Sequence, residues 1–75
     1  MACHALAIFR AYLESLPEDL LTTVTADYVW LAEAFRDDGE RGADFGMRRE
    51  CCRQECIRRG VPWLYDVAEG DVHAA

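Results

Sequence analysis

The chain has 75 residues, of which 52% are hydrophobic, and its formal net charge is −6 with eight basic and fourteen acidic residues. This length allows one domain at most, and the composition excludes a chain that is largely disordered. No apolar run approaches the about 20 residues that cross a bilayer, and no signal-peptide pattern is present, so we expect a cytoplasmic protein without membrane contact.

The first half of the chain predicts helices over residues 2–16, 17–23 and 26–38. Apolar residues recur every three or four positions from Leu6 to Leu16, and Ile8 and Tyr12 widen this stripe. Pro17 ends the first helix and opens the second. The threonine-rich run that follows is a poor helix former and predicts a break, after which Thr25 would cap a new helix that stops at Gly39.

The second half predicts one long helix over residues 43–59 and a tail over residues 60–75 that frays after residue 70. Gly60 and Pro62 are the residues that typically follow a helix C-terminus. The aromatic part of the tail would fold back over the helices. The predicted fold is therefore an all-α domain, a small three- to four-helix bundle with an aromatic C-terminal tail packed on it.

Two cysteines in the last predicted helix, Cys52 and Cys56, share one helix face because they are four residues apart. One interpretation is a zinc site that takes further ligands from Cys3, His4 or His73. The other is that both are small apolar core residues. We favour the core interpretation and expect no cofactor, with zinc as the alternative.

Cys51 lies beside Arg48, Arg49 and Arg53, which would favour a reactive thiolate if the sulfur were exposed. We expect Cys51 to be more exposed than Cys52. However, no third group that would orient a Cys–His pair can be placed, and so short a chain has little room for a substrate pocket. The protein is therefore predicted not to be an enzyme.

Arginine, tryptophan and tyrosine are the residues that most often anchor protein interfaces. All three occur where the arginine-bearing last helix is followed by Trp63 and Tyr65. This predicts a regulatory or adaptor protein that binds another protein, with a homodimer as a further form. The predicted contact residues are Arg48, Arg49, Arg53, Trp63, Tyr65 and Trp30. Direct binding to DNA or RNA is not expected, because Glu50 and Glu55 stand at ion-pair spacing from the arginines.

The acidic first half suggests an alternative function. Acidic side chains that share one surface would imitate a nucleic-acid backbone, as small inhibitor proteins of mobile elements do. The residues predicted to form this surface are Glu33, Asp37, Asp38 and Glu40. A zinc-binding helical module built on Cys52 and Cys56 is the third candidate.

Overall fold

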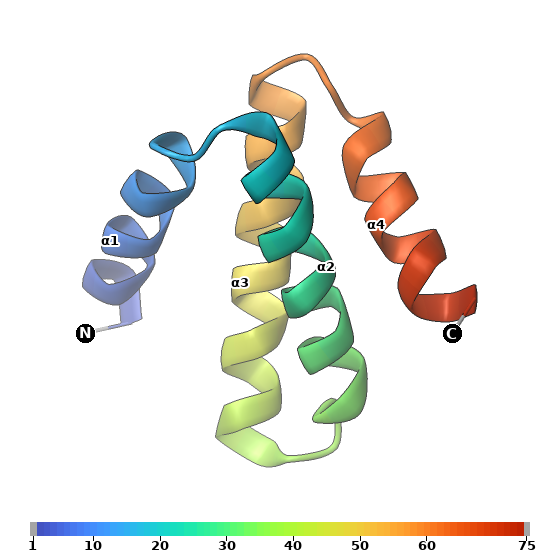
Figure 1. Ribbon diagram of the computed structural model, residues 1–75. Helices are drawn as coiled ribbons and strands as arrows, with labels where there is room; N and C mark the ends of the chain where they lie inside the picture. The colour runs from blue at the N-terminus through green and yellow to red at the C-terminus, as the bar shows by residue number, and fades with distance from the viewer. Residues whose placement is uncertain (1, 75) are drawn as a thin grey trace.

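The computed structural model describes residues 2–74, and the side chains of residues 5–73. Over this range the chain is all-α, as predicted, with four helices: α1 (Ala2–Glu14), α2 (Glu18–Ala34), α3 (Gly39–Arg58) and α4 (Trp63–Ala74). The antiparallel helices α2 and α3 form the centre, with α1 on one side and α4 on the other (Figure 1). The backbone measures 31 × 31 × 15 Å, so the molecule is flat. None of the four helices is long and apolar enough to span a membrane.

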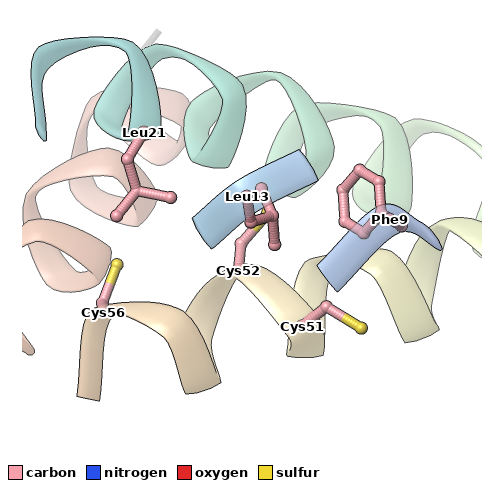
Figure 2. Close-up of a cluster of buried hydrophobic side chains, with 6 residues drawn as sticks. All are labelled: Phe9, Leu13, Leu21, Cys51, Cys52 and Cys56. Atoms are coloured by element: carbon pink, nitrogen blue, oxygen red, sulfur yellow. The ribbon is translucent and has the colours of Figure 1, made fainter. Parts of the chain in front are cut away.

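The core lies where α1 meets α2 and α3. It is built from Phe9, Leu13, Leu21, Cys51, Cys52 and Cys56 (Figure 2). Small cysteines on α3 leave room for the larger side chains of α1, which packs mainly on α3. Phe9 also meets the ring of Tyr28 on α2 edge to face, with 5.0 Å between ring centres. The core therefore holds α1 against both central helices.

The predicted break after residue 23 is wrong, because α2 is continuous from Glu18 to Ala34. Thr25, predicted as an N-cap, lies inside the helix with no exposed surface. It shares the buried face of α2 with Leu21 and Val29 at spacings of four. Thr22 satisfies its hydroxyl by donating to the carbonyl of Glu18, and Thr23 likewise donates to Asp19. Burial of one helix face thus outweighs weak helix propensity.

The turn between α2 and α3 has the predicted length of four residues but lies earlier, at residues 35–38 instead of 39–42. The helix α2 ends at Ala34, and α3 begins at Gly39, which adopts a left-handed φ of +47°. Gly42 follows in the first turn of α3, so close to the carbonyl of Phe35 that a β-carbon would collide with it. Gly39 therefore marks the start of a helix rather than the end of one, and Gly42 permits the close approach of the two helices.

The end of α3 confirms the prediction at Gly60. This glycine has φ of +75°; its amide donates to Ile57 and that of Val61 donates to Cys56, each over 2.9 Å. These two bonds form a Schellman motif. The predicted non-helical tail is wrong, however. Trp63–Ala74 forms α4, because Pro62 is well suited to a helix start and apolar residues recur on the side of α4 that faces α2.

Candidate functional site

Arg49 lies at the centre of a network that joins three helices. It donates to Tyr65 (2.7 Å) and Glu69 (2.6 Å) on α4 and to Glu33 (3.0 Å) on α2. The Tyr65 hydroxyl in turn donates to Glu69. Only 23% of the Arg49 side chain is exposed. Arg49 and Tyr65, both predicted to contact a partner, are therefore engaged within the molecule.

The network shifts the pKa of each member. Burial opposes the charge of Arg49, but hydrogen bonds to Tyr65, Glu33 and Glu69 raise its pKa. The hydrogen bond from Arg49 lowers the pKa of both Glu33 and Glu69. Burial raises the pKa of Tyr65. Both carboxylates are thus held ionised against a fixed guanidinium, which is the arrangement of a structural ion cluster rather than of a proton-transfer site.

A second cluster joins α3 to α1. The buried carboxylate of Glu55 accepts from Arg58 (2.6 and 2.8 Å) and from Arg59 (2.7 Å), and hydrogen bonding from Arg58 lowers its pKa. Arg59 also donates to the carbonyl of Leu13 in the last turn of α1. The predicted ion pairs from Glu55 are confirmed, and they anchor the end of α1.

Arg48 and Arg53, the other two arginines predicted to meet a partner, differ in exposure. Arg48 is largely covered; it pairs with Asp44 (3.0 Å) and stacks on the ring of Phe9, 4.9 Å from its centre. Arg53 is half exposed and pairs with Glu50 on the same helix. Of the arginines predicted to bind a partner, Arg53 alone is exposed and makes no hydrogen bond or ion pair to another helix within the described range.

The predicted acidic surface is divided by the fold. Glu33 belongs to the Arg49 network. Asp37 and Asp38 lie in the turn before α3, within 4.0 Å of Arg36 and 3.8 Å of Arg41 respectively. Glu40 is exposed in the first turn of α3. These carboxylates therefore do not form one uncompensated anionic patch.

The cysteines lie in the core. Cys52 and Cys56 have no exposed surface, which confirms their predicted packing role, whereas the predicted exposure of Cys51 is wrong because only 5% is exposed. The sulfur of Cys51 points away from the other two sulfur atoms (Figure 2). Burial raises the pKa of Cys52 to about 12 and also raises that of Cys56. The core thus keeps these two thiols protonated.

No three potential metal ligands converge among the residues whose side chains are described. Cys3 and His4, two of the predicted zinc ligands, lie outside that range, and His73 is exposed near the end of α4. Thr25 shares the core with Cys52 and Cys56. Its hydroxyl makes no hydrogen bond of good geometry within the described residues, although the two thiols lie close enough to interact with it weakly. The buried pair of cysteines is therefore a packing feature, with one poorly satisfied hydroxyl beside it.

Large apolar side chains remain exposed on two surfaces. One is at the junction of α3 and α4, where Ile57, Trp63 and Val67 are about half exposed. Arg53 and Tyr65 line a shallow pocket there with Ile57. Trp63, predicted to contact a partner, is thus available, with 54% of its surface exposed.

The second surface lies on the solvent side of α2 and on the flank of α1 towards α2, and Trp30 is the one residue of it that was predicted to contact a partner. We call it the α1–α2 face and define it by Ile8, Tyr12, Leu20, Asp27, Trp30 and Leu31. Trp30 is 55% exposed, and Ile8, Tyr12 and Leu20 are similarly open. Asp27, Trp30 and Leu31 line one shallow depression on α2.

The contacts of α1 show which of its two flanks belongs to this face. The flank with Arg10 and Glu14 borders α3 beside Cys51. Ile8 and Tyr12 lie on the other flank. The ring centre of Tyr12 is 6.1 Å from that of Phe9, and Phe9 in turn meets Tyr28 of α2. The exposed apolar side chains of α1 therefore face the α2 side of the molecule.

One feature of the sequence points to this face. Ile8 and Tyr12 widen the apolar stripe of α1 beyond what one buried side of a helix accommodates. Leu20 and Trp30 do the same for α2, opposite its buried residues. An apolar arc too wide for the core is the signal that would have indicated a second contact surface.

Charge separates the helices as well. The helices α1, α2 and α4 together carry eight acidic residues and one arginine, Arg10. Six of the eight arginines lie on α3 or at its C-cap. Within the described residues Asp27 forms no ion pair, although it lies amid the apolar side chains of the α1–α2 face.

No protein-family model, curated protein sequence or solved structure is significantly similar to the chain. The functional argument therefore rests on the geometry of the molecule itself.

Proposed function

We propose that this chain is a non-enzymatic regulatory or adaptor protein that binds another protein through the α1–α2 face. The observation that carries the proposal is the exposure of four large apolar side chains. Ile8 and Tyr12 lie on α1, and Leu20 and Trp30 lie on the solvent side of α2. Grouped apolar exposure of this kind marks interaction surfaces, and tryptophan is the residue most enriched among binding hot spots.

The surface differs from the one that the arginine pattern favours. Arg49 and Tyr65 already satisfy one another across α3 and α4, so a partner would have to break their bonds to reach them. Trp30, in contrast, makes no hydrogen bond that a partner would have to replace within residues 5–73. Truncation of Trp30 should therefore weaken binding without removing a hydrogen bond that supports the fold.

Two matched tryptophans allow a direct test. Trp30 lies in the last turns of α2 and Trp63 begins α4, so the two are near opposite ends of α3 (Figure 1). Their exposed fractions are 55% and 54%. A partner captured from cells of the source organism should bind Trp30→Ala at least about tenfold more weakly than wild type, and Trp63→Ala nearly as well as wild type. If only Trp63→Ala weakened partner binding, the binding surface would be the α3–α4 junction and not the α1–α2 face.

The acidic inhibitor remains the second candidate, supported by the excess of acidic residues on α1, α2 and α4. Charge mimicry of nucleic acid depends on many carboxylates and little on apolar contact. It predicts binding that weakens steeply with salt and is insensitive to Trp30→Ala. Binding by the α1–α2 face predicts the opposite result. Binding should be sensitive to Trp30→Ala and should weaken little with salt, because salt hardly screens the burial of an apolar side chain.

A further inference from the structure

We infer that the partner segment of the α1–α2 face is a basic amphipathic helix of another protein. This inference rests on the proposed function, whose surface it occupies. It combines the charge of the face, its length and the geometry of α2, each of which constrains the occupant separately.

Charge selects a basic partner. Asp27 lies beside Trp30 and Leu31 and has no ion-pair partner among the described residues. The helix α2 carries no arginine or lysine, and the one arginine of α1, Arg10, lies on the opposite flank of α1 beside α3. An apolar segment that covers Asp27 without a cation would leave its carboxylate desolvated and unpaired, which is costly. A lysine or arginine next to the apolar stripe of the partner removes that cost.

The length of the face fits a helix. Leu20 and Leu31 of α2 are eleven residues apart, which corresponds to a rise of about 16 Å along the helix axis. Three turns of a partner helix, with apolar anchors at i, i+4, i+7 and i+11, span the same distance. The α2-side flank of α1, with Ile8 and Tyr12, forms the other side of the binding surface.

A second copy of this chain fits less well. Asp27 lies close to the middle of α2, which runs from Glu18 to Ala34. Two-fold pairing of the helices would bring the two Asp27 carboxylates together, and like charges in contact are destabilising. Anionic lipid and nucleic acid are disfavoured by the same acidic charge.

The test uses the full chain and a displayed library of peptides of about 20 residues, tiled across the proteome of the source organism and long enough for five helical turns. Selection is run against wild type, Trp30→Ala, Asp27→Lys and Asp66→Lys. Asp66 is exposed on α4 at the α3–α4 junction. Its reversal changes the net charge as much as that of Asp27, so it controls for long-range electrostatics.

We expect the enriched peptides to be amphipathic, with lysine or arginine beside the apolar stripe. They should bind Asp27→Lys at least about tenfold more weakly than wild type and should retain most of their affinity for Asp66→Lys. Acidic amphipathic peptides should replace them in the selection against Asp27→Lys.

Other outcomes separate the two claims. Enriched peptides that require Trp30 but carry no excess of basic residues would overturn the inference and leave the proposed function standing. Enrichment that is indifferent to Trp30→Ala, or no enrichment at all, would overturn both. A dimer in light scattering that Asp27→Lys strengthens would assign the face to a second copy instead.

Discussion

The Arg49 network makes the sharpest prediction about stability. Arg49→Met keeps the side-chain length but removes three hydrogen bonds that join α3 to α2 and α4. Bonds to charged groups contribute about 1.5–3 kcal/mol each when buried. The Glu33 and Glu69 side chains are 33% and 37% exposed, so water can solvate both carboxylates in the variant and offset much of the lost free energy. We expect a net loss of about 2 kcal/mol, which lowers Tm by about 8–16 °C in a domain of this size.

Two further variants test the cause. Arg49→Lys keeps the charge but not the planar fork, so its Tm should fall between wild type and Arg49→Met. Arg53→Met removes one exposed bond within α3, to Glu50, and should change stability by less than about 0.5 kcal/mol. Thermal unfolding followed by circular dichroism measures all three. A Tm for Arg49→Met no lower than that for Arg53→Met would refute the account of the network.

The network also predicts the pH dependence of stability. The folded pKa values of Glu33 and Glu69 lie below the ordinary value of 4.5. Their contribution is therefore present above pH 4.5 and is lost as the pH falls through the folded pKa values. Arg49→Met should flatten this acid-side decline in denaturant titrations. Glu55 contributes a separate decline of the same sign, which the variant should retain.

Three other substitutions and conditions test the packing. Gly42→Ala should lower stability by at least about 1 kcal/mol, because its β-carbon would collide with the Phe35 carbonyl; an unchanged Tm would contradict the close approach. Thr25→Val should raise stability by about 1 kcal/mol by removing a buried hydroxyl whose neighbours are weakly polar thiols, and a loss would show that these thiols satisfy the hydroxyl. Above pH 9 the unfolded chain loses the Cys52 proton while the folded chain keeps it up to about pH 12; stability should fall across this range, less steeply in Cys52→Ala.

Local signals in the sequence account for part of the fold. The Gly60 turn forms from bonds between residues a few positions apart, so its glycine is recognisable without the rest of the chain. The same holds for the ion pairs from Glu55 to Arg58 and Arg59, which share one helix face. Burial of Cys52 and Cys56 follows from their common position on that helix.

Other features depend on contacts between distant segments. The partners of Arg49 lie 16 to 20 residues away on two other helices, so a run of arginines looks like a surface feature until α2 and α4 are placed. Thr25 continues α2 because its position faces the core, which outweighs its weak propensity. Cys51 is covered because α1 packs on its side of α3.

The sequence indicated that aromatic side chains would be exposed, but it did not indicate which surface they would form. Exposed aromatic residues predicted protein binding, and Trp30 and Trp63 are both exposed. Which of them belongs to the α1–α2 face depends on how α1 and α2 lie together. Ile8 and Tyr12 join that surface because the flank of α1 that carries them faces α2, whereas the opposite flank borders α3.

The most direct test of the α1–α2 face is a titration of the isotope-labelled protein, followed by nuclear magnetic resonance, with the tightest peptide from the library. The chain has two tryptophans, so the two indole N–H signals report separately on Trp30 and Trp63. We predict that the Trp30 signal and the backbone amides around Asp27 shift on binding, while the Trp63 signal stays in place. A shift of the Trp63 signal with that of Trp30 unchanged would contradict the assignment of the binding surface.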